Sequence, residues 1–114
     1  MKVVFLFAFA ICVTACQSLS PGEQRARYEG HALAQATCGR CHAVERLGES
    51  PNAGAPPFSG IVNQPGLTRE TLSSWLRDAH NYPEEMAFSL DRKNVDALVE
   101  YMLTLRDKDY RPPI

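Results

Sequence analysis

The chain has 114 residues, 45% of them hydrophobic, and 12 Lys and Arg against 13 Asp and Glu give it a formal net charge of −1. This length allows one small domain and leaves little room for a second core. A net charge near zero with dispersed basic residues argues against a nucleic-acid partner, because such a partner requires a clustered basic face.

The first sixteen residues, "MKVVFLFAFAICVTAC", predict an export signal. Lys2 precedes an apolar run that is too short to span a bilayer and has the length of a signal h-region. Small residues before Cys16 indicate a bacterial lipobox, so residues 1–15 would be removed and the Cys16 thiol would carry lipid. Ordinary cleavage near Ala15 stays open as the alternative. Either cleavage predicts a periplasmic protein, and the lipid would anchor it to a membrane without a spanning helix.

Residues 16–24 contain Ser, Pro and Gly and predict a tether, whereas residues 25–37 are prone to form a helix. Residues 47–66 are rich in Gly and Pro, so we expect no regular helix and no central strand there. A loop of this length in such a short domain suggests that it wraps around something.

Two amphipathic helices are predicted next. In "LTRETLSSWLRDAHN" the apolar residues recur at i, i+3, i+4 and i+7, and Thr68 is a suitable N-cap. In "LDRKNVDALVEYMLTLRDKD" a second apolar stripe follows Ser89 or Asp91 as the cap. With no alternating strand pattern, residues 25–108 predict an all-α domain, and residues 109–114 a tail.

The motif "CGRCH", residues 38–42, allows three interpretations. A redox-active thiol pair usually follows a strand, whereas "ALAQAT" before Cys38 is helical. Structural zinc usually requires two ligand pairs, and His31 and His80 are single and far apart. The same pattern is the attachment signature of c-type haem: the Cys38 and Cys41 thiols add to the two vinyl groups, and His42 is held under the iron. The export signal favours haem independently, because attachment requires an exported apoprotein.

From about residue 25 to 106 the chain resembles the class I (monohaem) cytochrome c family. Gly30 and Leu33 precede the motif at the spacing of the family's first helix, and Tyr101 in "LVEYM" matches its last helix. The segment "APPFSGI" is similar to the family's "GPxLxG" turn, and "TLSSWL" before "YP…M" to its third helix and distal loop. The resemblance implies a small cytochrome c fold, with about three main helices wrapped around one covalently bound haem c.

The resemblance also implies roles on the proximal side of the haem. Cys38 and Cys41 would form the thioether bonds, and His42 would be the proximal iron ligand. The carbonyl of Pro56 would accept a hydrogen bond from the far nitrogen of His42 and fix the orientation and basicity of the ring.

On the distal side, the resemblance implies that Met86 is the second axial ligand, and that Trp75 and Tyr82 form walls of the pocket. His80 is the competing ligand, because imidazole also binds haem iron. The segment "PEEMAF" lacks the proline that usually follows the ligand in this family, so ligation by Met86 is less secure.

We therefore expect an electron carrier rather than an enzyme, a monomer that meets redox partner proteins in the periplasm or membrane. The family's lysine-rich docking face is absent, which implies a different partner or recognition by packing. Two alternatives stay open. One is a haem protein with a labile distal ligand that binds gases or peroxide, and the other is a cytochrome subunit of a larger periplasmic dehydrogenase or oxidase.

Overall fold

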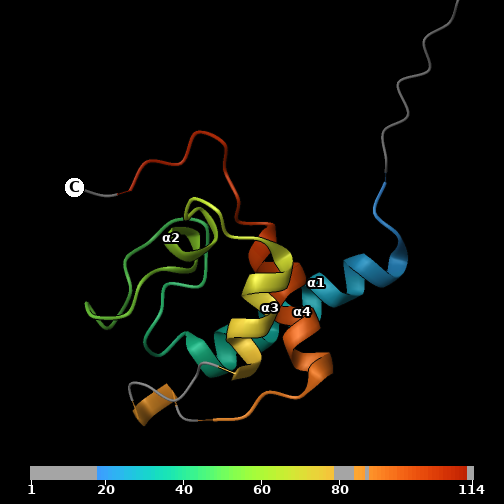
Figure 1. Cartoon of the computed structure of the whole chain (residues 1–114), viewed down its shortest axis with the longest axis horizontal. Helices are drawn as coiled ribbons and strands as arrows, with labels where there is room; N and C mark the ends of the chain where they lie inside the picture. The colour runs from blue at the N-terminus through green and yellow to red at the C-terminus, as the bar shows by residue number, and fades with distance from the viewer. Residues whose placement is uncertain (1–17, 79–83, 87, 113–114) are drawn as a thin grey trace, which may run out of the picture.

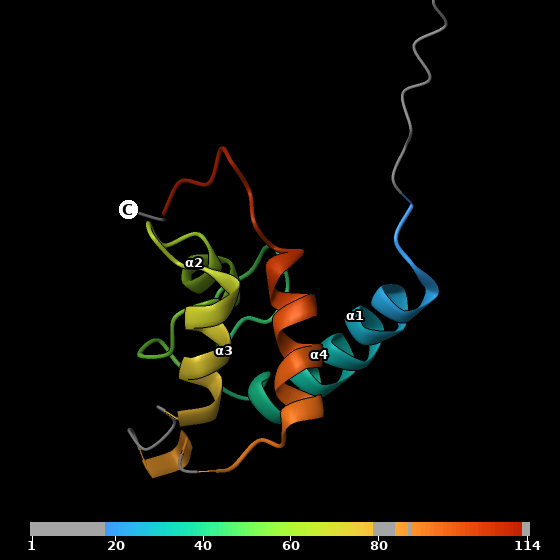
Figure 2. The ribbon, with the colours of Figure 1, turned by 45° about the vertical axis from the view of Figure 1, so that its right-hand side comes forward.

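The computed structural model describes residues 18–78, 84–86 and 88–112. Its helical elements are α1 (Pro21–Leu33), a π-helical turn η1 (Ala34–Cys38), α2 (Phe58–Val62), α3 (Arg69–Asp78), a 3₁₀ turn η2 (Glu84–Met86) and α4 (Arg92–Leu103). No strand occurs within these ranges, so the all-α prediction is confirmed. In Figures 1 and 2, α1 crosses α4, α3 lies beside α4, and the connection from η1 to α2 runs on the side away from the start of α1.

The crossing of α1 and α4 depends on Gly30, which is buried. A Cβ atom at this position would collide with the carbonyl oxygen of Ala97 and would lie 2.9 Å from the Cβ of Tyr101. The two helix backbones are therefore in direct contact at Gly30.

The core lies between α3, α4 and the loops that close over them. Both helices bury the predicted apolar stripes, with exposed fractions of 0–5%: Leu72 and Leu76 from α3, and Val95, Leu98, Val99 and Met102 from α4. Trp75 belongs to the same predicted stripe but is 40% exposed. Its ring therefore lies at the edge of the core rather than within it.

The first helix begins at Pro21, four residues before the predicted start at residue 25. The Oγ atom of Ser20 accepts a hydrogen bond from the Glu23 N–H at 3.3 Å, and Glu23 Oε2 accepts one from the Ser20 N–H at 2.8 Å. This capping box, with proline in the first turn, is a strong helix start. The predicted tether is therefore wrong from Pro21 onward, and Cys16 with the predicted signal peptide lies outside the described residues.

The segment predicted to be a loop, residues 47–66, contains the short helix α2, which corrects that prediction. Pro56 and Pro57 precede the helix rather than interrupting it, and proline is compatible with a helix start. Phe58 and Val62, one turn apart, are 4% and 2% exposed. Burial of these two side chains, rather than local propensity, stabilises a helix of this length.

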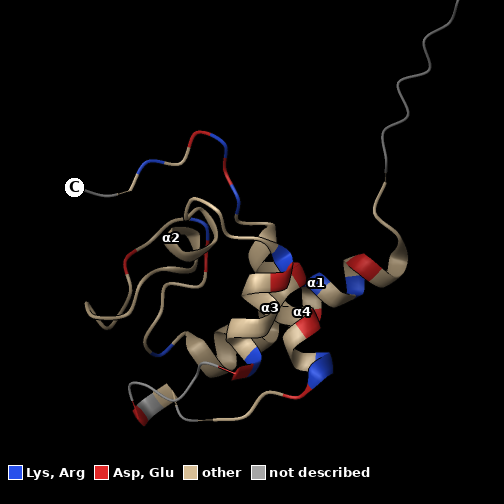
Figure 3. Ribbon diagram, viewed as in Figure 1, with Lys and Arg blue, Asp and Glu red and all other residues tan. Residues whose placement is uncertain are grey.

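Charged residues of both signs are interspersed over α1, α3 and α4 (Figure 3). Both lysines in the described ranges form ion pairs, Lys93 with Glu29 at 3.6 Å and Lys108 with Asp109 at 2.7 Å. Exposed pairs of this kind contribute little to stability. None of the helices in the described part of the chain is both long and apolar enough to span a bilayer.

Candidate functional site

The residues of the "CGRCH" motif follow a change in helix geometry at η1. The Gly39 N–H donates to the carbonyl of Ala34, five positions back, at 2.9 Å. The N–H groups of Cys41 and His42 then both donate to the carbonyl of Cys38, at 3.0 and 2.9 Å. π-Helical turns occur frequently at functional sites. This one ends α1 in a tight turn that carries all three chemically distinctive side chains.

His42 is the one buried polar residue among the described side chains, at 8% exposed. Its Nδ1 lies 2.7 Å from the carbonyl oxygen of Pro56, the pair that the resemblance implied. Because a carbonyl only accepts, Nδ1 is the donor in this pair, and in a neutral imidazole with that tautomer Nε2 holds the lone pair that can bind a metal. The Phe58 ring packs against the imidazole with centroids 5.7 Å apart.

An apolar cavity of about 360 Å³ lies against the motif. The structure brings six of the seven predicted cofactor-binding residues to this cavity: Cys38, Cys41, His42, Pro56, Trp75 and Met86. The seventh, Tyr82, lies outside the described residues, as does the competing ligand His80. A cavity of this size and apolar character is typical of cofactor sites.

The two thiols are not paired with each other in the structure. Burial, and secondarily the neighbouring Cys41, raises the pKa of the Cys38 thiol to about 11. Within the described residues, no group of three or more His, Cys, Asp or Glu side chains could hold a metal ion, so nothing there supports the zinc alternative. Two free thiols and a metal-binding imidazole beside one apolar cavity fit a haem that is attached through its vinyl groups.

A family model of cytochrome c matches residues 28–106. The chain belongs to the cytochrome c family. Membership means that this cytochrome binds haem c covalently, and Cys38 and Cys41 fit the attachment motif. Proteins of this family generally transfer electrons and typically have no enzymatic activity. They are generally located outside the cytoplasm. Comparison with the curated proteins and with the solved structures found no match.

Several residues of the cytochrome's cavity were not predicted. Phe88, 37% exposed, lines it two positions after Met86, and Asn52 lines it from the long loop. The Asn52 N–H also donates to the carbonyl of Cys41 at 3.1 Å, which ties this loop to the motif. The aromatic residue in "EEMAF" was the available signal for Phe88, whereas nothing local marks Asn52. Met102, expected in the core, is 1% exposed and also contacts the cavity.

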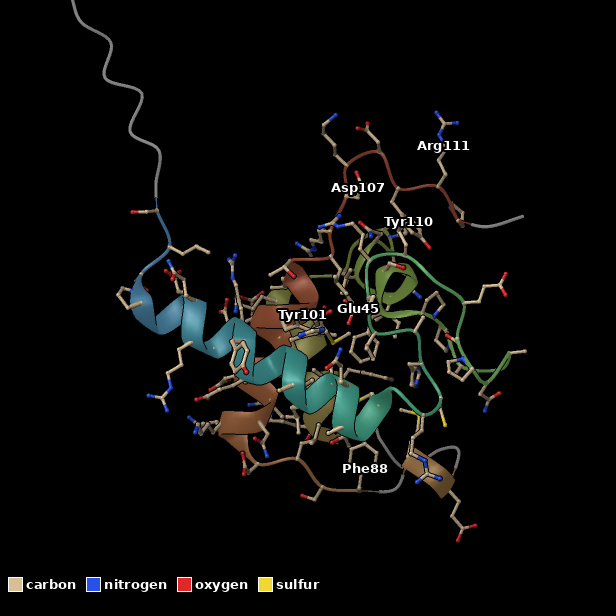
Figure 4. All side chains as sticks on the ribbon, turned by 180° about the vertical axis from the view of Figure 1, so that it is seen from behind. Glu45, Phe88, Tyr101, Asp107, Tyr110 and Arg111 are labelled. Atoms are coloured by element: carbon tan, nitrogen blue, oxygen red, sulfur yellow. The ribbon has the colours of Figure 1, made fainter. Side chains whose placement is uncertain are left out.

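A cluster of polar side chains between α1, α4 and the segment that follows the motif was not predicted either. His31 Nε2 lies 2.6 Å from Glu45 Oε1, and the Tyr101 hydroxyl donates to the Val44 carbonyl at 2.7 Å. The rings of His31 and Tyr101 are 4.7 Å apart, and Figure 4 shows Glu45 beside Tyr101. The hydrogen bond with His31, together with one from Gln35, lowers the pKa of Glu45. The cluster joins α1 and α4 to the segment that follows the motif.

Replacing Tyr101 by phenylalanine should lower the free energy of unfolding by about 1–2 kcal/mol near neutral pH, because the buried Val44 carbonyl loses its donor. Burial, and secondarily Glu45, raises the pKa of Tyr101 from 10.0 to about 12. The stability that the neutral phenol contributes is thus fully present below about pH 10 and is lost as the pH rises to about 12. The phenylalanine variant should lack this alkaline loss.

Urea unfolding followed by far-UV circular dichroism across the alkaline range measures both effects. Tyr28→Phe is the matched control, because Tyr28 is 76% exposed and its replacement should change neither quantity. An alkaline slope in Tyr101→Phe equal to that of the wild type would show that another group causes the decline.

Proposed function

We propose that the protein is a periplasmic electron carrier in which His42 and Met86 are the axial ligands of the haem iron. The observation that carries this proposal is that both side chains line the same apolar cavity as Cys38 and Cys41. The two thiols would form the thioether bonds. When bound, the haem supplies the one-electron change between ferrous and ferric iron.

The two ligands would set the reduction potential in opposite senses. Donation from His42 Nδ1 to the Pro56 carbonyl makes the imidazole more basic, which favours ferric iron. The thioether of Met86 is neutral and soft, which favours ferrous iron and raises the potential. With haem bound, the apolar lining would keep water away from both ligands. The partly exposed Trp75 and Phe88 mark the side of the cavity from which electrons would enter and leave.

We further propose that redox partner proteins in the periplasm or membrane dock at this side by packing rather than by attraction to lysines. Both described lysines are paired with acidic side chains, and the exposed Trp75 and Phe88 provide apolar contact area at the cavity. The carrier is expected to be a monomer that Cys16 anchors through lipid. Such an anchor would raise its effective concentration near membrane-bound partners.

A second candidate function is binding of a gas or peroxide at the distal side. It is favoured by the short turn that carries Met86: η2 has three residues, no proline follows the methionine, and the Met86 side chain is half-buried. A sulfur ligand on such a turn could leave the iron and open a binding position. Absence of carbon monoxide binding to the reduced holoprotein would argue against this function.

Replacing Met86 by alanine tests the proposed ligation in protein matured in an exporting host with the c-haem assembly system. We expect the wild type to show a c-type, low-spin spectrum with a weak sulfur-to-ferric-iron band, and the variant to lose that band and become high-spin. Met102→Leu is the matched control, because it removes a buried sulfur atom at nearly constant volume. A spectrum that Met86→Ala leaves unchanged would transfer the distal role to another residue, with His80 as the first to test.

A further inference from the structure

The segment that follows α4, residues 104–112, runs back toward α2 (red in Figures 1 and 2), and we call it the C-terminal strap. Asn63, the residue after α2, is its main attachment point. Asn63 Oδ1 accepts a hydrogen bond from the Asp107 N–H at 2.9 Å. Asn63 Nδ2 donates to the carbonyl of Leu105 at 3.3 Å and, within α2, to that of Ser59 at 2.8 Å. One side chain thus binds both α2 and the strap.

Two further strap residues hold α2. Arg106 donates from Nε to the Val62 carbonyl at 3.3 Å and from Nη2 to the Leu67 carbonyl at 2.6 Å. Tyr110, labelled in Figure 4, is half-buried, and its hydroxyl would lie 3.3 Å from a Cβ added to Gly60. A helix of five residues is not stable by itself. The position of α2 therefore depends on the strap as well as on its own buried side chains.

The opposite end of α2 carries the hydrogen-bond partner of His42. The Pro56 carbonyl accepts from His42 Nδ1 at 2.7 Å, and the Phe58 N–H donates to the Ala43 carbonyl at 2.9 Å. Pro57 has φ −65°, fixed by its ring, and it restricts Pro56 to extended conformations. Few soft dihedral angles separate α2 from the Pro56 carbonyl, so a displacement of the helix moves this oxygen relative to the imidazole.

We propose that Asn63 is a positioning residue for the proximal histidine: by binding α2 to the C-terminal strap, it keeps the Pro56 carbonyl within hydrogen-bond distance of His42 Nδ1. This inference rests on the proposed ligation by His42. A short hydrogen bond increases the basicity of the imidazole and favours ferric iron. Loosening the bond should raise the reduction potential and let the Nδ1 proton exchange faster with water.

The test compares holoprotein with Asn63→Ala, which removes all three hydrogen bonds of this side chain. The midpoint potential is measured by redox titration, and exchange of the His42 ring proton by NMR in the diamagnetic, reduced state. We expect an upward shift of the potential and an exchange rate at least about tenfold higher, because the proton's acceptor is less well placed. Val95→Ala is the control, because Val95 is fully buried on α4 and is not among the residues that line the cavity.

The proposal would be overturned if Asn63→Ala lost stability as Val95→Ala does but kept the midpoint potential and the ring-proton exchange rate of the wild type. If Asn63→Ala cannot be matured with haem, Tyr110→Ala decides by the same two measurements, since it removes a strap contact without changing α2. We expect it to shift both in the same direction and by less, and no shift overturns the proposal. A wild type without the ring-proton resonance of an iron-bound histidine would instead refute the ligation by His42 itself.

Discussion

Replacing Cys38 and Cys41 together by serine is expected to abolish covalent haem attachment and to leave the chain unfolded. Serine hydroxyls cannot form the thioether bonds that hold the cofactor. Without the cofactor, the apolar side chains that line a cavity of about 360 Å³ would face water. A small domain has a total stability of only about 5–15 kcal/mol, so we expect the loss of this packing to unfold it. The cofactor is thus expected to be part of the core as well as the redox centre.

Haem staining of a denaturing gel measures the attachment, and far-UV circular dichroism of the purified chain measures the folding. Cys16→Ser is the matched control, because it also removes a cysteine but should leave haem attachment intact. A double variant that keeps haem through denaturation would contradict the assigned attachment sites. A haem-free variant with wild-type helix content would contradict the structural role of the cofactor.

Replacing Gly30 by alanine should lower the free energy of unfolding by about 3 kcal/mol, although alanine favours helices. The added methyl group would meet the backbone of Ala97, which cannot rotate away as a side chain can. Relief requires that α1 and α4 move apart, and this separation would disturb the packing on both sides of the crossing. Denaturant unfolding of the oxidised holoprotein measures the loss.

Gly22→Ala, in the same helix, is the control for this experiment. The nearest heavy atom to a Cβ at Gly22 is the Ser20 Oγ atom, 4.0 Å away. The substitution should therefore be neutral or stabilising by up to about 1 kcal/mol. Equal stability of the two variants would mean that α1 and α4 do not approach each other closely at Gly30.

Local patterns in the sequence were sufficient to predict α3 and α4, because each has a stripe of apolar residues at helical spacing. They failed at α1, where Pro21 and Gly22 were interpreted as signs of a tether. The decisive signal was the pair Ser20 and Glu23, which places a capping box around that proline. They also failed at α2, since a five-residue helix owes its stability to distant contacts that no local pattern records.

For the site as well, the sequence was sufficient to predict some residues and not others. The motif residues and Met86 could be named because the family pattern is short and specific, and the structure places them at one cavity. The contacts of Asn63 with Leu105 and Asp107, and of His31 with Glu45, join segments far apart in the chain. Asparagine, histidine and glutamate are common on surfaces and in loops. Their presence in the sequence therefore does not reveal which residues they contact.

The early start of α1 has a consequence for the reach of the molecule. The N-cap Ser20 is only four positions after Cys16, and an extended chain spans at most about 14 Å over four such steps. If Cys16 carries lipid, the first turn of α1 stays within that distance of the bilayer surface. Figures 1 and 2 place this turn and η2 at opposite ends of the domain. The end of the domain that carries η2 and Met86 would then face away from the membrane. This end would be accessible to partners that project from the membrane or diffuse past it.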